Sequence, residues 1–258
     1  MSDLFAMWGN TRMVVLTAIC AALYAAILIP FKVVPLIPGI TEFRPANAVP
    51  VVLSFLFGPA AAWGAAFGNL IGDFFSGLGP GDLFGFLGNL GYGFVPYAVW
   101  QAVTDEPPTP DTVGRAVGLV AVIALASLLC ATVVGWGLHW LGFHPFTLLA
   151  SVVFVNNVVA AAVLAPLLLR VLYPRIARAH LLYSDLRGPR PATSRLRRGL
   201  GVALVLVGTV GAFTAGQLIA SGRWLPPWAV LHSVSGGAEV GLGLLPILAL
   251  VVIGCALL

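Results

Sequence analysis

The sequence carries very little charge for its length. Only 9% of its 258 residues are charged, whereas a soluble globular domain carries about 25%. Hydrophobic residues make up 60% of the chain. This composition excludes an ordinary soluble domain and predicts a protein that crosses a membrane several times.

The sequence also lacks the short motifs that mark several enzyme classes. It contains no G-x-x-x-x-G-K-[ST] phosphate-binding loop, no H-E-x-x-H zinc motif and no G-x-S-x-G nucleophile elbow. Its three cysteines, Cys20, Cys130 and Cys255, fall in apolar runs without metal-ligand spacing. We therefore expect no metal site, no cofactor and no enzymatic activity, but a protein that binds a small molecule.

Positive charge is concentrated in one short segment. Eight of the thirteen cationic residues lie between positions 170 and 198. Such a cluster beside membrane spans sets topology and contacts anionic lipid, which argues against a nucleic-acid partner. With the N-terminus inside, only Lys32, Arg44 and Arg223 lie outside. The positive-inside rule therefore predicts that both termini are cytoplasmic.

Apolar runs separated by Pro- and Gly-rich breaks predict eight helices. We expect them at about 13–31, 46–57, 59–76, 82–103, 116–141, 146–172, 199–221 and 240–258. A full crossing needs about 20 apolar residues, so the short second run predicts a partial or broken helix. The fold class is an all-α polytopic membrane protein, a six-helix bundle plus two C-terminal transmembrane helices.

The Arg-rich segment divides the chain into three predicted parts. Residues 1–172 form a six-span substrate-binding membrane domain, and residues 173–198 form a cytoplasmic linker. Residues 199–258 form a two-span C-terminal extension.

Five polar side chains interrupt the apolar runs: Asn69, Asp73, Asn89, Asn156 and Asn157. A polar group in hydrocarbon costs free energy unless it is paired or faces a wet cavity. At about 1.5 Å of rise per residue, Asn69 and Asn89 lie roughly 10 Å below the outer surface on neighbouring helices. Asp73 lies nearer that surface, and the other two lie near the midplane. We predict a substrate pocket that opens to the outer side.

Further residues complete the candidate pocket. Glu42, Arg44 and Asn47 lie at its outer entrance, and Tyr92 and His139 join the predicted substrate-binding set. Simpler alternatives remain for individual residues. An asparagine can bond a neighbouring helix, and Asp73 can form a structural ion pair with Arg44.

Two rows of small residues are spaced for close helix contact. Gly64, Gly68 and Gly72 form one row, and Ala18, Ala22 and Ala26 form the other. Small residues at this spacing let helices approach closely. The alanine row serves either internal packing or docking of another membrane subunit.

Three stretches carry a resemblance to a known family. They are Thr41–Pro50 (TEFRPANAVP), Leu56–Pro59 (LFGP) and Gly68–Asp73 (GNLIGD). Together they resemble the substrate-binding S components of energy-coupling factor (ECF) transporters, and most of all the QueT-like group linked to queuosine-precursor uptake. The resemblance covers about residues 12–172. The alanine row of the first span resembles the motif by which S components dock on the transmembrane T component.

The resemblance implies a function and a set of partners. The chain would be the membrane-embedded substrate-capture subunit of an ECF-type ABC importer for a vitamin or nucleobase-like micronutrient, such as a queuosine precursor. Its partners would be a T component, two cytoplasmic ATPase subunits and the lipid of a prokaryotic plasma membrane, and loop 32–45 would act as a lid. The alternative is a stand-alone small-solute transporter or channel without ATPase partners. A third interpretation is an intramembrane enzyme that uses Asp73 and His139.

Overall fold

The computed structural model describes residues 2–32, 34–37, 41, 42, 44–187, 194–230 and 237–258. The regular secondary structure of this part is helical except for one small antiparallel hairpin, β1 (Pro35–Ile37) with β2 (Thr41–Glu42). The N-terminal helices are α1 (Ser2–Ala6), η1 (Met7–Gly9), α2 (Thr11–Phe31), η2 (Pro45–Asn47), α3 (Ala48–Phe57) and α4 (Pro59–Phe74). The central helices are α5 (Asp82–Val103), α6 (Val113–Trp140), α7 (Phe146–Arg178) and α8 (Tyr183–Arg187). The last three are α9 (Arg195–Ala220), α10 (Pro227–Val230) and α11 (Ala238–Leu257).

Five helical stretches in the described residues are long and apolar enough to cross a membrane. They are α2, α6, the stretch that begins with α7, α9 and α11. The segment from η2 through α3 is apolar but shorter, as expected for the partial second helix. These features confirm the predicted fold class, an all-α polytopic membrane protein.

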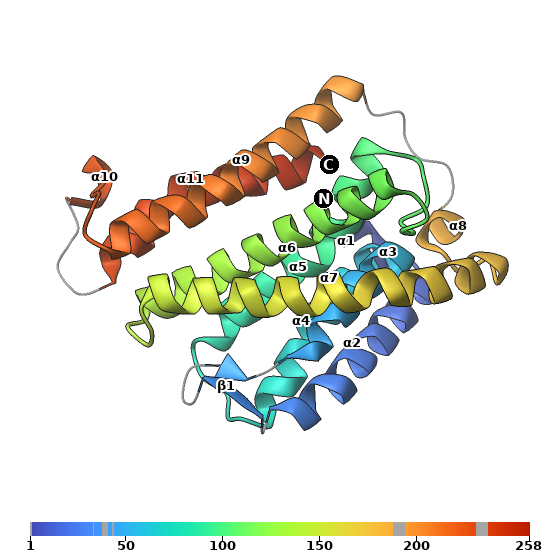
Figure 1. The fold of residues 1–258 in the computed structure, drawn as a ribbon, viewed down its shortest axis with the longest axis horizontal. Coiled ribbons are helices and arrows are strands. Elements are labelled where there is room, and N and C mark those ends of the chain that lie inside the picture. The colour runs from blue at the N-terminus through green and yellow to red at the C-terminus, as the bar shows by residue number, and fades with distance from the viewer. Residues whose placement is uncertain (1, 33, 38–40, 43, 188–193, 231–236) are drawn as a thin grey trace.

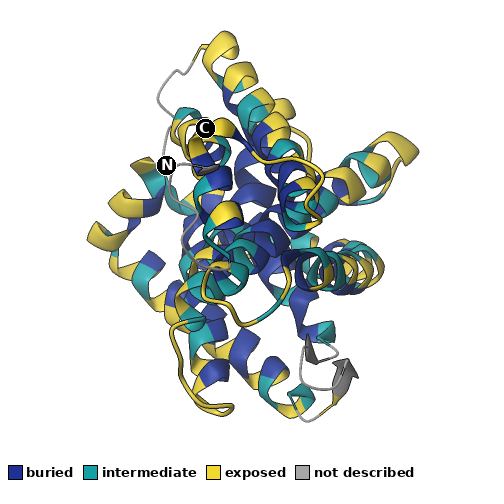
Figure 2. Cartoon of the chain, turned by 90° about the vertical axis from the view of Figure 1, so that its left-hand side faces the viewer, coloured by how far each residue is buried: buried dark blue, intermediate teal, exposed yellow. Residues whose placement is uncertain are grey.

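The helices form a bundle in which chain neighbours pack side by side. α2 packs along α4, α4 along α5, α5 along α6, and α6 along α7. The short helix α3 lies among α4, α5 and α7 and is almost entirely buried. The view in Figure 2 shows buried residues concentrated in the middle of the bundle, with exposed ones on the outward faces.

The C-terminal pair α9 and α11 lies on the α6 side of the bundle, away from α2 (Figure 1). Glycines allow the two helices to approach closely, since a Cβ at Gly208 would lie 2.8 Å from a methyl group of Val251. Polar contacts attach the pair to the bundle. Trp136 Nε1 donates to the carbonyl oxygen of Gly241 at 2.8 Å, and Gln217 Nε2 donates to Ser151 Oγ at 3.0 Å.

Prolines and glycines set several helix boundaries. Gly58 has a φ of +54°, which a residue with a side chain rarely adopts, and it separates α3 from α4. α7 departs from the expected end at residue 172 because it continues past Pro174 to Arg178. The proposed linker at 173–198 therefore begins as helix, and its residues 188–193 lie outside the described part.

Candidate functional site

A polar cavity of about 260 Å³ lies at the end of the bundle where α4 ends and α5 begins. Its polar lining comes from α2, η2, α4, α5, α7 and the segment before η2. These side chains are Tyr24, Arg44, Asn47, Asn69, Asp73, Asp82, Asn89, Asn156 and Asn157. α6 contributes an apolar wall that includes Val134 and Leu138. The cavity thus combines several amide groups with one apolar wall.

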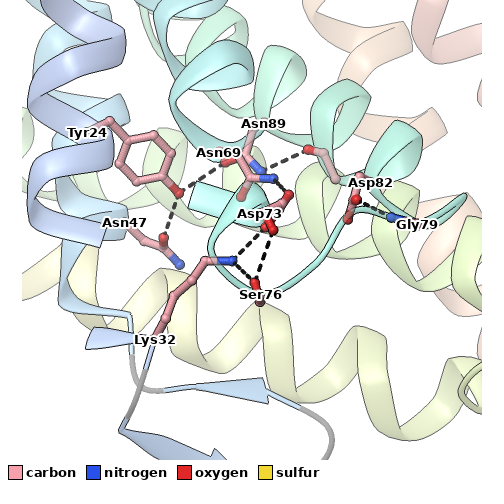
Figure 3. Close-up of polar contacts among 10 residues, drawn as sticks. Tyr24, Lys32, Asn47, Asn69, Asp73, Ser76, Gly79, Asp82 and Asn89 are labelled. Atoms are coloured by element: carbon pink, nitrogen blue, oxygen red, sulfur yellow. Dashed lines mark hydrogen bonds and ion pairs between the residues drawn. The ribbon is translucent and has the colours of Figure 1, made fainter. Parts of the chain in front are cut away.

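A hydrogen-bonded network holds Asn47 at the centre of this site. Tyr24 Oη donates to Asn47 Oδ1 at 3.0 Å and also lies 3.3 Å from Asn89 Oδ1 (Figure 3). Asn47 Nδ2 donates to Asn157 Oδ1, and Tyr92 Oη donates to the Asn47 carbonyl oxygen at 3.0 Å. A phenol has one proton to donate, so Tyr24 satisfies only one of the two amide oxygens at a time. The other oxygen is open to a donor on a bound molecule.

Both oxygens of the Asp73 carboxylate have a partner in the protein. Lys32 Nζ lies 2.8 Å from Asp73 Oδ1 and donates to Ser76 Oγ at 2.6 Å (Figure 3). Asn69 Nδ2 donates to the other carboxylate oxygen, Oδ2, at 2.6 Å. The ion pair is largely shielded, with the Lys32 and Asp73 side chains 8% and 12% exposed. The partner of Asp73 is therefore Lys32, not the Arg44 that the sequence suggested.

One buried acceptor in the cavity wall is unfilled. Asn69 is 2% exposed, and its Oδ1 has no hydrogen-bond partner among the described residues. A buried polar atom without a partner costs about 1–3 kcal/mol. An N–H or O–H group of a bound molecule would remove that cost.

The structure brings most of the predicted site residues together. Seven line the cavity: Arg44, Asn47, Asn69, Asp73, Asn89, Asn156 and Asn157. Tyr92 is fully buried behind Asn47, which it supports through a hydrogen bond. The side chain of Glu42 lies outside the described part of the structure.

His139 has a different place from the one expected. Its Nδ1 accepts a hydrogen bond from the backbone N–H of Phe146 at 3.1 Å. That contact closes the turn between α6 and α7, and His139 does not line the cavity. The backbone of His139 also lies against Gly237, just before α11.

Sequence reasoning missed Tyr24 and Lys32. Tyr24 lies on the face of α2 that packs on α4, and Lys32 follows the last residue of α2 on the same side, with Leu28 between them at four-residue spacing. A signal was available, because α2 and α4 run in the same direction and end at the same level. The depth argument that paired Asn69 with Asn89 also places Lys32 beside Asp73.

The small residues of α2 separate into two rows with different surroundings. Ala21 and Ala25 are buried, whereas Ala18, Ala22 and Ala26 are exposed. The buried row contacts the glycines of α4, since a Cβ at Gly68 would lie 2.9 Å from the Ala21 carbonyl oxygen. The exposed row makes no such contact with α4.

These features define a class: a polytopic membrane protein with a polar cavity at one end of a helical bundle. The family model described as QueT transporter matches residues 14–174. The chain belongs to this family, which is the S-component-like family of ECF transporters, and it is a transporter for a small solute. No curated protein and no solved structure matches the chain. The family match ends within α7, so α9 and α11 lie beyond it.

Proposed function

We propose that the chain is the substrate-capture subunit of an ECF-type importer and that the amide-lined cavity holds its solute. The observation that carries the proposal is the convergence of five asparagines and Arg44 on one cavity within a bundle that belongs to a transporter family. Polar side chains are expensive within a membrane span and are retained there mainly for function.

The cavity chemistry favours a neutral, planar solute with hydrogen-bond donors and acceptors along its edge. The charge of Asp73 is balanced by Lys32, and the lining residues Arg44 and Asp82 carry opposite charges. The other polar groups of the lining are the amides and the Tyr24 hydroxyl. A side-chain amide both donates and accepts hydrogen bonds. Asn69 Oδ1, which has no partner among the described residues, could accept one from a donor on the solute. Nucleobase-like compounds and several vitamins have such edges, and a queuosine precursor is one candidate.

The exposed alanine row supports docking on a T component. Ala18, Ala22 and Ala26 follow one another at four-residue spacing on α2, which keeps them on one face. Their small side chains allow another helix to approach closely. Two ATPases bound to that T component would drive release of the solute on the cytoplasmic side.

The direction of uptake requires the cavity to open outward. Gly79 and Gly114 suit a labelling test because each has open space around its Cβ position and they lie at opposite ends of the bundle. The native cysteines are all buried. A membrane-impermeant maleimide should label Gly79→Cys and spare Gly114→Cys in intact cells. The reverse pattern would contradict the proposed orientation.

Copurification and transport test the partners. The tagged chain should copurify with a T component and an ATPase pair, and solute uptake should depend on ATP hydrolysis. Uptake by the chain alone in proteoliposomes, without ATPases, would favour the stand-alone transporter.

A further inference from the structure

A second cavity of about 260 Å³ lies at the opposite end of the bundle. It is formed by the C-terminal ends of α3, α5 and α7, the segment after α5, and α8. Its walls combine aromatic side chains, among them Tyr97, Trp100 and Tyr183, with the charged side chains of Asp105, Glu106 and Arg187. Asn89 and Trp100 are eleven residues apart on α5, about 16 Å by helix rise, so this cavity is distinct from the amide-lined site.

The walls of this second cavity are held in place by their own contacts. Trp100 Nε1 donates to the carbonyl oxygen of Glu106 at 2.7 Å, which fixes the segment after α5. Tyr183 lies against Gly58, where a Cβ would come within 2.6 Å of its ring. Its hydroxyl donates to Asp3 Oδ2 at 2.9 Å, and Arg187 pairs with the same oxygen at 3.2 Å. The positive charge of Arg187 is therefore balanced.

Two polar groups of this cavity remain unfilled. Tyr97 is 4% exposed, and its hydroxyl has no hydrogen-bond partner among the residues that the structure describes. Asp105 is exposed at the rim, and its carboxylate forms no ion pair within the described ranges. Its neighbour Glu106 pairs with Arg115 at 3.3 Å. The cavity thus combines aromatic faces, an unfilled buried hydroxyl and an unbalanced negative charge.

We propose that this cavity binds a small organic ammonium ion with an aromatic or apolar body, separately from the transported solute. Aromatic faces attract a cation, and the Asp105 carboxylate adds a complementary charge at the rim. The Tyr97 hydroxyl oxygen can accept a hydrogen bond from an N–H group of the ligand. This bond gives the hydroxyl the partner that it lacks among the described residues. An anion would be repelled by the Asp105 carboxylate, and a neutral ring would gain nothing from its charge.

The test uses benzylammonium as the probe and benzyl alcohol as its neutral counterpart. Binding to the purified full chain in nanodiscs is measured by ligand-observed NMR titration. Asp105→Asn should weaken benzylammonium binding about fivefold and reduce its salt dependence. Tyr97→Phe should weaken it about three- to tenfold, the loss expected for one hydrogen bond. The matched control is Asp82→Asn, an acid of the amide-lined cavity, which should leave binding unchanged.

Thermal unfolding separates a ligand contact from a structural role. Tyr97→Phe removes a buried hydroxyl that has no partner, so the melting temperature should not fall while probe affinity does. Equal binding of benzyl alcohol, unchanged benzylammonium affinity in both variants, or an equal loss in Asp82→Asn would each overturn the proposal. None of these outcomes bears on solute capture at the other end of the bundle.

Discussion

The two faces of α2 have opposite surroundings. The inner face carries Cys20, Tyr24 and Leu28, is almost completely buried, and packs on the glycine row of α4. The other face carries Ala18, Ala22 and Ala26 among exposed aliphatic side chains. A repeat of small residues therefore does not show by itself whether it packs within the protein or contacts another helix. The inner face packs on α4 and positions polar groups of the amide-lined cavity, whereas the exposed alanine row is available to another helix.

The largest effect on stability should come from Lys32, at the end of the inner face. Lys32→Met leaves the Asp73 carboxylate without its cation in a largely shielded site. Breaking a buried pair by removing one partner costs about 3–5 kcal/mol. Thermal or denaturant unfolding of the purified protein should show this loss.

A second change at the same pair is its control. Lys32→Met combined with Asp73→Asn removes both charges and should recover most of the lost stability. If Lys32→Met alone is as stable as the unmodified chain, the ion pair is not a structural element of the inner face.

The glycine contact in the middle of the inner face should give the next largest effect. A Cβ at Gly64 would lie 2.3 Å from Cys20 Cβ and 3.1 Å from the Ala21 backbone nitrogen. Backbone cannot yield as a flexible side chain does, so Gly64→Ala should destabilise by about 1–3 kcal/mol. Gly114→Ala is the matched control because nothing lies within 4 Å of its Cβ position. Equal melting temperatures for the two variants would show that α2 and α4 do not pack this closely.

A hydrogen bond at the cavity should give a smaller effect. Tyr24→Phe removes the donor shared by the amide oxygens of Asn47 and Asn89. The loss of one such bond is worth about 0.5–1.5 kcal/mol. The unfolding free energy should fall by that amount, and a fall as large as that of Lys32→Met would contradict the shared-donor geometry.

The outer face should show the smallest effect on stability. Ala22→Leu places bulk on an exposed position, so the free energy of unfolding should stay within about 0.5 kcal/mol of that of the unmodified chain. Its effect should appear in assembly, because a larger side chain blocks close approach of the T component. Ala21→Leu, one position away on the buried face, should instead damage the fold. If Ala22→Leu assembles normally with its partners, docking uses another surface.

The helices were largely predictable because each depends on local sequence. Apolar runs ended by Gly58-Pro59 or by the segment from Gly77 to Gly81 locate α3, α4 and α5 within a few residues. The exception is α7, where two prolines fall inside the helix. Proline removes one hydrogen bond of a helix but does not fix where it ends, so the extension to Arg178 could not be read from the sequence.

Most residues that line the candidate cavity were predictable, but their contacts with one another were not, and their role in binding a substrate stays a prediction. The cost of polar groups in a membrane selected the asparagines and Asp73, and seven of the ten predicted residues line the cavity. Pairing depends on which helix faces meet. Lys32 took the place expected for Arg44, and His139 closes the turn between α6 and α7. The predicted extension at 199–258 gave no indication that Trp136 of α6 would bond α11.

Native mass spectrometry of the purified protein tests the central claim most directly. The unmodified chain should carry a small heterocyclic molecule, bound in the amide-lined cavity. Asn69→Leu, which at nearly constant size removes the unfilled acceptor together with the hydrogen bond to Asp73, should lose that molecule, whereas Ser184→Ala at the opposite end should retain it. Retention of the molecule at full occupancy by Asn69→Leu would show that the solute does not bind where the asparagines converge.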